Sequence, residues 1–199
     1  MRKFIAISCL CALVALAAGQ AQAQSIKGKL GVTGRIGFTI PADSDYGPYK
    51  IETDAGFIGG GGFIYGIDNN FAAEIDITNT SYGSEDPAGG NRGDFDVTNI
   101  ALGGQYRFES SQANLTPYVG AGLDILLSDY DRLGHSVDTT VGAHATGGVD
   151  FFINRQVALN AEAKILVAPE TDINGPGGKA GNFDPSSFTG TFGVRLFFN

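Results

Sequence analysis

The stretch LGVTGRIGFTI, residues 30–40, decides the fold, because its side chains alternate in character with a period of two. One face carries apolar side chains and a glycine: Leu30, Val32, Gly34, Ile36, Phe38 and Ile40. The other face is polar or small: Lys29, Gly31, Thr33, Arg35, Gly37 and Thr39. Alternation over this length predicts a β-strand whose two faces meet different surroundings.

The same alternation returns along the rest of the chain. It is visible near residues 53–67, 71–78, 99–108, 118–127, 144–151, 157–167 and 188–198. The glycine run 59–62 hides the phase of the first of these segments, in which we expect Phe57, Phe63 and Tyr65 on the apolar face. Together the segments predict an all-β chain of eight strands.

The connectors between these strands alternate in length. Short turns are expected at 68–70, 109–115 and 154–156, and long polar loops at 41–52, 81–94, 129–140 and 168–186. Short turns on one side and long loops on the other are typical of a transmembrane β-barrel. We therefore predict an eight-stranded antiparallel transmembrane up-and-down β-barrel with both termini on the short-turn side.

The composition excludes other classes. Gly supplies 30 of the 199 residues, and each glycine costs a helix interior about 1 kcal/mol, which argues against a helical bundle. The net charge of −8 argues against a nucleic-acid partner. Charged residues make up only 17% of the chain, whereas the outside of a soluble barrel is normally rich in Lys and Glu. The sequence therefore favours lipid outside the barrel and polar side chains inside.

Aromatic residues gather near the expected strand ends, as they do at membrane interfaces. Near the short turns these residues are Tyr65, Phe71, Tyr106, Phe108, Phe151 and Phe198, and near the long loops they are Phe38, Phe57, Tyr82 and Phe188. They predict two girdles, one at each membrane surface.

Residues 1–23 have the pattern of a cleaved signal peptide, with Arg2 and Lys3 before an apolar stretch and Ala21-Gln22-Ala23 at the cleavage site. The barrel domain would then span 24–199. Cleavage removes both cysteines and lowers Lys+Arg from 13 to 11 against 21 Asp+Glu, a net charge of −10. We therefore expect no disulfide, zinc site or cofactor, and Sec-type export to the cell outer membrane.

Four segments resemble the OmpW-like family within the small eight-stranded, OmpA-like outer-membrane barrels. They are DNNFAAEI at 68–75, TPYVGAGL at 116–123, GVDFFIN at 148–154 and ALNAEAK at 158–164. The resemblance implies a barrel that serves as a narrow conduit or binding site for small hydrophobic molecules. The alternative is a structural or surface-interaction barrel, adhesin-like, with no transport role.

The last strand carries a further signal. TFGVRLFF at 191–198 has the polar-x-Gly-x-x-apolar-x-aromatic pattern of terminal strands in assembled outer-membrane barrels. The resemblance implies that the barrel-assembly machinery reads this strand. The remaining expected partners are outer-membrane lipids and lipopolysaccharide.

Charged residues on the polar faces are few and of both signs. They are Lys29, Arg35, Glu74, Asp76, Arg107, Asp150, Glu162, Lys164 and Arg195. Buried charges must pair, because an unpaired one costs several kcal/mol, so we expect a salt-bridged network inside the barrel. This network is interpreted as structural packing rather than an ion gate.

The outward half of the lumen is expected to be less charged. Ile58, Leu126 and Leu166 point inward there and predict an apolar pocket that would suit a hydrophobic ligand. The histidines, His135 and His144, have no nucleophile beside them at strand spacing on the lipid face. The expectation is therefore a protein that is not an enzyme and holds no metal.

Overall fold

The structure is a computed structural model. It describes the backbone of residues 25–42, 44–46, 49–51, 55–85, 91–110, 114–130, 136–137, 139–175 and 178–198. Within these ranges it also describes the side chains, except those in 43–54, 82–95, 128–138 and 171–183. The expected signal peptide at 1–23 lies outside the described residues, so its cleavage stays a prediction. Among the described residues, no helix is both long and apolar enough to cross a membrane.

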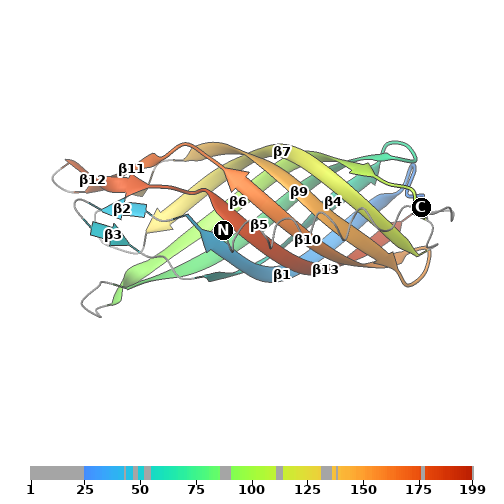
Figure 1. Ribbon diagram of the computed structural model, residues 1–199, viewed down its shortest axis with the longest axis horizontal. Coiled ribbons are helices and arrows are strands. Elements are labelled where there is room, and N and C mark those ends of the chain that lie inside the picture. The colour runs from blue at the N-terminus through green and yellow to red at the C-terminus, as the bar shows by residue number, and fades with distance from the viewer. Residues whose placement is uncertain are drawn as a thin grey trace, which may run out of the picture.

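Eight long strands close into a barrel, as predicted (Figure 1). They are β1 (Leu30–Pro41), β4 (Gly56–Gly66), β5 (Phe71–Glu85), β6 (Asn91–Arg107), β7 (Leu115–Tyr130), β9 (Thr140–Phe152), β10 (Val157–Val167) and β13 (Ser187–Phe198). Each pairs antiparallel with its neighbours in the chain, and β1 pairs with β13 to close the ring. The pairing of β1 runs from Leu30 opposite Phe198 to Pro41 opposite Ser187.

The two faces of each barrel strand have the predicted character. Ile36 and Phe192 are 60% and 66% exposed on the outside, whereas Thr33 and Arg195 are 2% and 0% exposed on the inside. The phase of β4 is also as predicted, since Phe57, Phe63 and Tyr65 are exposed while Ile58 is buried. An apolar outside and a polar inside is the arrangement that a lipid-embedded barrel requires.

The long connectors contain more strand than we expected from the sequence. Short strands within them form a second sheet in the order β3-β2-β12-β11-β8, which extends beyond the barrel at the end opposite the C-terminus (Figure 1). These strands are β2 (Ser44–Tyr46), β3 (Tyr49–Ile51), β8 (Ser136–Val137), β11 (Thr171–Gly175) and β12 (Gly178–Phe183). The prediction of loops throughout these segments was therefore wrong, because short polar strands lack the apolar alternation that reveals a membrane strand.

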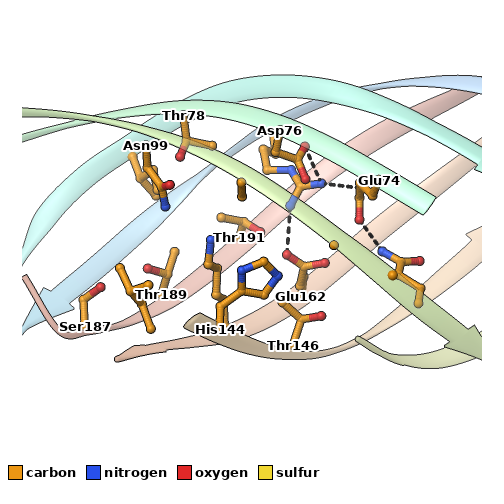
Figure 2. Close-up of a pocket in the computed structure, with 18 residues that line it drawn as sticks. Glu74, Asp76, Thr78, Asn99, His144, Thr146, Glu162, Ser187, Thr189 and Thr191 are labelled. Atoms are coloured by element: carbon orange, nitrogen blue, oxygen red, sulfur yellow. Dashed lines mark hydrogen bonds and ion pairs between the residues drawn. The ribbon is translucent and has the colours of Figure 1, made fainter. Parts of the chain in front are cut away.

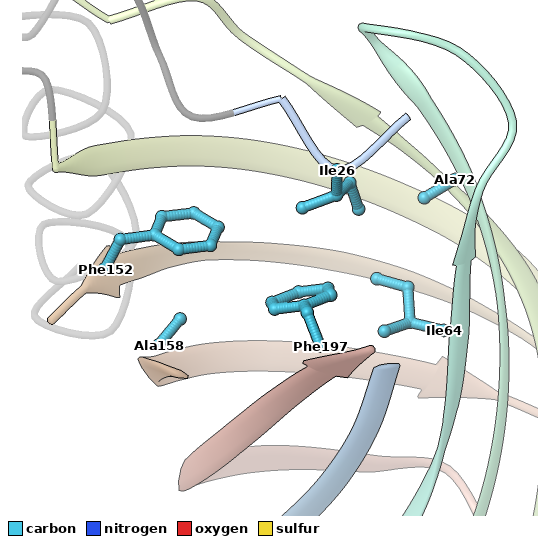
Figure 3. Packing of buried hydrophobic residues seen from close by; sticks show 6 residues of the cluster. All are labelled: Ile26, Ile64, Ala72, Phe152, Ala158 and Phe197. Carbon is cyan, nitrogen blue, oxygen red and sulfur yellow. The ribbon is translucent and has the colours of Figure 1, made fainter. Parts of the chain in front are cut away.

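An apolar cluster fills the lumen at the short-turn end. Its members are Ile26, Ile64, Ala72, Phe152, Ala158 and Phe197, and the rings of Phe152 and Phe197 stack with their centroids 5.7 Å apart (Figure 3). Ile26 precedes the first strand and is 1% exposed. Gly28 has a φ of 71° and its N–H donates to the carbonyl of Gly66 at 2.7 Å, which holds the chain in a turn that carries Ile26 inward.

Candidate functional site

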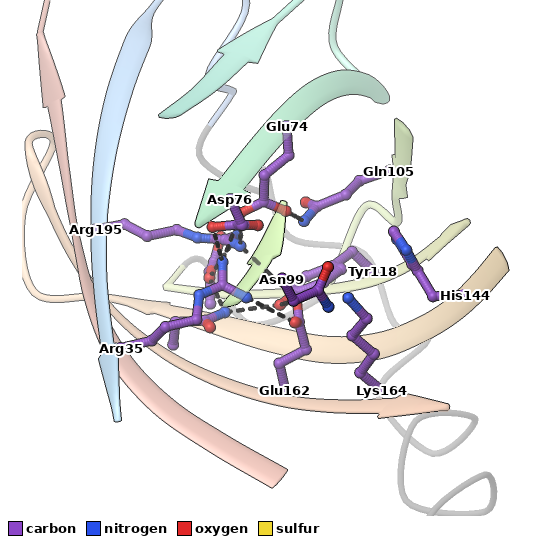
Figure 4. Close-up of polar contacts among 12 residues, drawn as sticks. Arg35, Glu74, Asp76, Asn99, Gln105, Tyr118, His144, Glu162, Lys164 and Arg195 are labelled. Atoms are coloured by element: carbon purple, nitrogen blue, oxygen red, sulfur yellow. Dashed lines mark hydrogen bonds and ion pairs between the residues drawn. The ribbon is translucent and has the colours of Figure 1, made fainter. Parts of the chain in front are cut away.

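A network of ion pairs crosses the middle of the lumen (Figure 4). Three guanidinium groups and four carboxylates from six strands take part: Arg35 of β1, Glu74 and Asp76 of β5, Arg107 of β6, Asp150 of β9, Glu162 of β10 and Arg195 of β13. All of these side chains are buried. The network therefore ties together strands that are not neighbours in the barrel wall.

Arg195 and Arg35 are the centres of this network. Nη2 of Arg195 lies 2.8 Å from Oε1 of Glu74, and its Nη1 lies 3.0 Å from Oδ2 of Asp150. Arg35 contacts Glu74 and Glu162 at 2.8 Å and Asp76 at 3.0 Å. Because each guanidinium is shared between carboxylates, desolvation of the charges is offset by several contacts at once.

Neutral side chains complete the network. The Tyr118 hydroxyl donates to Oε2 of Glu162 at 2.7 Å. The guanidinium carbon of Arg195 lies over the Tyr118 ring, 5.1 Å from the centroid of that ring. Asn160 donates to Asp150 at 2.7 Å and to the Tyr118 oxygen at 2.8 Å. Gln105 donates to Glu74. These contacts use lone pairs of the buried carboxylates that the arginines leave free.

A second polar cluster is centred on Asp124 of β7. His144 and Lys164 both contact its carboxylate, and Asn99 donates to Oδ1 at 2.7 Å. From the sequence we grouped Lys164 with the main network; the structure pairs it with Asp124 instead. The sequence also grouped Lys29 there, but its amine donates to the Arg155 carbonyl at 3.2 Å, at the short-turn end.

A small cavity lies beside both clusters (Figure 2). Its volume is about 50 Å³, which gives room for a few water molecules. Its lining includes Arg35, Asp76, Thr191 and Lys164, with Ile58 and Leu166 also among the lining residues. Most of its lining residues are therefore polar or charged, while two of the three residues expected to form an apolar pocket also line it.

Apolar side chains are nevertheless buried in the part of the lumen toward the long loops. Ile58, Leu126 and Leu166 are 7%, 2% and 5% exposed, and Val97 joins them at 7%. Leu126 and Val97 are not among the residues that line the cavity. The register places Val97 opposite Thr80 and Leu126 opposite Thr140, so threonines share this part of the lumen.

Several residues of these clusters were missed as site residues. Tyr118, Asp124 and His144 fall on the polar faces of their strands, but nothing in the alternation of the sequence indicates which partners they meet. Pairing of β7 with β9 sets Gly122 opposite His144 and Asp124 opposite Gly142, and these glycines leave room across the strand pair. Among the described residues, no group of three or more His, Cys, Asp or Glu side chains is arranged to hold a metal ion.

Comparisons with known proteins agree with this geometry. Residues 9–195 match the family model described as an outer membrane protein beta-barrel domain. No curated protein sequence matches the chain significantly.

Three solved structures show the same fold. The outer membrane protein OprG from Pseudomonas aeruginosa superposes with a TM-score of 0.72 at 17% identity, covering 90% of this chain and 100% of that one. Neisserial surface protein A gives 0.62 at 20% identity, covering 86% and 100%. The attachment invasion locus protein Ail of Yersinia pestis, in complex with the heparin analogue sucrose octasulfate, gives 0.54 at 14% identity, covering 86% and 99%. At these identities the likeness shows the fold alone.

Proposed function

The chain belongs to the family of outer-membrane protein β-barrel domains, and from that premise we propose that it binds small hydrophobic molecules at the outward end of its lumen. As an outer-membrane protein it is surrounded by the lipids and lipopolysaccharide of that membrane. In such barrels the short turns face the periplasm and the longer loops face outward. The second sheet is therefore at the external end.

The observation that carries the proposal is the uneven distribution of apolar side chains along the lumen. Ile58, Val97, Leu126 and Leu166 lie toward the external end, and the ion network separates them from the apolar cluster at the periplasmic end. Binding sites for small molecules are usually apolar, with a few polar groups that fix orientation. Here Thr80 and Thr140, which lie opposite Val97 and Leu126, and the Lys164 amine would supply those polar groups.

Binding is favoured over free passage. Eight strand pairs close the described barrel wall into a ring, and the cavity of about 50 Å³ is too small for most solutes. A solute would therefore occupy the external mouth, or displace side chains to go deeper. A conduit function would require movement of both the apolar cluster at the short-turn end and the ion network, or an opening in the barrel wall.

The proposal is tested by methyl NMR in lipid nanodiscs, with a small water-soluble apolar alcohol as the probe. We expect saturable shifts of the inward-facing methyl groups of Ile58, Leu126 and Leu166. Leu126→Ala should weaken the binding, while Leu127→Ala, the same change on the lipid face, should leave it unchanged. Shifts that fail to saturate, or equal effects of the two variants, would contradict the proposal. Uptake of the same probe into proteoliposomes would separate a conduit from a binding site.

A surface-interaction role is the second candidate. The strands β11 and β12 form an external hairpin that joins the second sheet, and a sheet of this kind presents a surface beyond the membrane. Replacing the hairpin by a short turn should leave the barrel folded and abolish binding to host-cell surfaces if this role is correct. Unchanged cell binding would remove this candidate.

Two further parts of the proposal concern catalysis and assembly. We assign no catalytic role, since His144 contacts Asp124 inside the barrel, away from the lipid face on which a lipid-modifying enzyme would need its base. We also propose that the barrel-assembly machinery reads the last strand, whose Phe192, Leu196 and Phe198 all face outward.

A further inference from the structure

The polar cluster around Asp124 lies on the periplasmic side of an apolar layer, formed by Ile58, Val97, Leu126 and Leu166. On three strands an apolar side chain of the layer lies two residues from a member of the cluster, on the same inward face: Leu126 after Asp124 on β7, Leu166 after Lys164 on β10, and Val97 before Asn99 on β6. Across strand pairs, Asn99 lies opposite Leu126, and His144 opposite Leu166. A hydrophobic molecule in the layer would therefore meet these polar groups at its deeper end.

Two members of the cluster keep unused capacity for hydrogen bonds. Nζ of Lys164 and Nδ2 of Asn99 both contact the same atom, Oδ1 of Asp124, so the amine and the amide lie side by side (Figure 4). An ammonium group carries three donors, and among the described residues Asp124 is the partner of this one. Oδ1 of Asn99 is buried and has no hydrogen-bond partner among the same residues. Free donors therefore lie next to a free acceptor.

The charges of the lumen favour a ligand without charge. Among the described residues of the two polar clusters, the carboxylates are Glu74, Asp76, Asp124, Asp150 and Glu162, and the permanent cations are Arg35, Arg107, Lys164 and Arg195. A proton on His144 would only balance these charges, so no net positive charge is available to an anionic head group. A cationic head group would meet Arg35 and Lys164, which both line the cavity. Burying either kind of head group would therefore be costly.

We propose that the molecule bound in the apolar layer is an uncharged amphiphile with a terminal hydroxyl group, of the class of medium-chain primary alcohols. Its hydroxyl oxygen accepts a hydrogen bond from the Lys164 amine, and its O–H donates to Oδ1 of Asn99. The cavity of about 50 Å³, which Asn99, Lys164 and Leu166 all line, has room for a hydroxyl group, and the chain lies toward the external mouth. This inference rests on the function proposed above and adds the chemical class of the ligand.

The test uses probes that share one chain and differ in the head group: 1-hexanol, hexane, hexanoate and hexylamine, the last two charged at neutral pH. Each is titrated into the full barrel in lipid nanodiscs, and the saturable methyl shifts of Leu126 and Leu166 give its dissociation constant, expressed relative to its concentration in the lipid. We expect 1-hexanol to bind at least about tenfold more tightly than each of the others, because it alone satisfies both free groups without adding a charge.

Matched variants locate the hydrogen bonds. Asn99→Ala removes the acceptor, and Asn79→Ala makes the same change on the exposed face of β5. Lys164→Met removes the donor, and Lys29→Met, at the short-turn end, is its control. We expect the preference for 1-hexanol over hexane to fall about fivefold or more in Asn99→Ala and Lys164→Met, and to persist in the controls. In wild type, the side-chain amide resonance of Asn99 should shift with 1-hexanol and not with hexane, a readout that needs no variant to fold.

Binding of hexane as tight as that of 1-hexanol would overturn the inference and leave the proposed hydrophobic site standing. Tighter binding of hexanoate or of hexylamine would overturn it as well, since a charged head group would then be preferred. An Asn99 amide that does not respond to bound 1-hexanol would show that the hydroxyl group lies elsewhere. If none of the four probes binds saturably, the proposed function fails together with this inference.

Discussion

Arg195 illustrates how a charged side chain can occupy the centre of this barrel. It is 0% exposed, yet its guanidinium contacts Glu74 and Asp150 and lies over the ring of Tyr118. Each contact comes from a different strand, so the residue couples β5, β7 and β9 to β13. A pair of this kind adds little net stability when intact, but removing one partner leaves buried charges behind.

Arg195→Met should therefore lower the free energy of unfolding by about 3–5 kcal/mol, because Glu74 and Asp150 would lose their shared partner. Arg155→Met, at an exposed turn, should change it by less than about 0.5 kcal/mol. Urea unfolding of the refolded protein in lipid vesicles measures both values. A loss as small as that of Arg155→Met would mean that the network rearranges around the missing cation.

Asp68 allows a pH prediction at the residue scale. Its Oδ1 accepts hydrogen bonds from the N–H groups of Asn70 at 2.8 Å and Phe71 at 2.7 Å, and these bonds hold the pKa of Asp68 below its usual value of 3.8. A carboxyl with a lowered pKa stabilises the fold above its unfolded pKa, and loses this effect as the pH falls through its folded pKa.

Asp68→Asn should therefore destabilise the protein at neutral pH, and the difference from wild type should shrink as the pH falls below about 3.8. Acid unfolding followed by the heat-modifiable gel shift measures the difference, and carbon-detected NMR of the Asp68 carboxyl gives its titration directly. A difference that stays constant down to pH 2 would show that the hydrogen bonds do not depend on the charge.

At the scale of the strands, alternation predicted the barrel because lipid imposes one requirement on every outward position. The rule even fixed the phase of β4, where four consecutive glycines carry no signal, from Phe57, Phe63 and Tyr65. It failed where both faces are apolar. The pairs Phe151-Phe152 and Phe197-Phe198 each direct one ring to lipid and one into the lumen, and that doubling was the available sign of the apolar cluster.

Side-chain pairing inside the lumen could not be predicted in the same way. Lys164 and Asp124 lie on β10 and β7, which are separated in the wall by β9, so their contact depends on the curvature of the barrel and the stagger of three strands. Strand parity fixes only the face on which a residue lies. The individual ion pairs therefore required the structure.

The segment before β1 behaves as a structural element of its own. A Cβ on Gly66 would lie 2.1 Å from the carbonyl oxygen of Ile26, whereas a Cβ on Gly34 would meet nothing within 4 Å. Gly66→Ala should therefore displace Ile26, while Gly34→Ala should not. Hydrogen exchange of the Gly28 amide, which bonds to the Gly66 carbonyl, should accelerate about tenfold or more in Gly66→Ala alone. Equal protection of the Gly28 amide in both variants would show that the segment before β1 accommodates the added methyl group and keeps its place in the lumen.

At the scale of the whole molecule, the lumen is a series of layers. From the periplasmic end these are the apolar cluster with Ile26, the ion network with Arg195, the small cavity beside Lys164, and the apolar layer with Leu126. Eight strands leave an interior only wide enough for side chains or one small ligand. The apolar cluster and the ion network each close the lumen. Because they lie in series, both must be removed before ions can pass.

Removal of residues 24–28 should therefore leave the ion conductance in planar bilayers at the wild-type level, even though it eliminates Ile26 from the periplasmic cluster. The ion network above that cluster stays intact, because Arg35, Arg195 and their carboxylate partners make no contact with this segment among those described. The same truncation should expose Phe197, so that a cysteine introduced at position 197 reacts with a water-soluble maleimide in the truncated barrel and not in the full-length one. A rise in conductance on truncation alone would show that the N-terminal segment is the seal and that water already passes through the ion network.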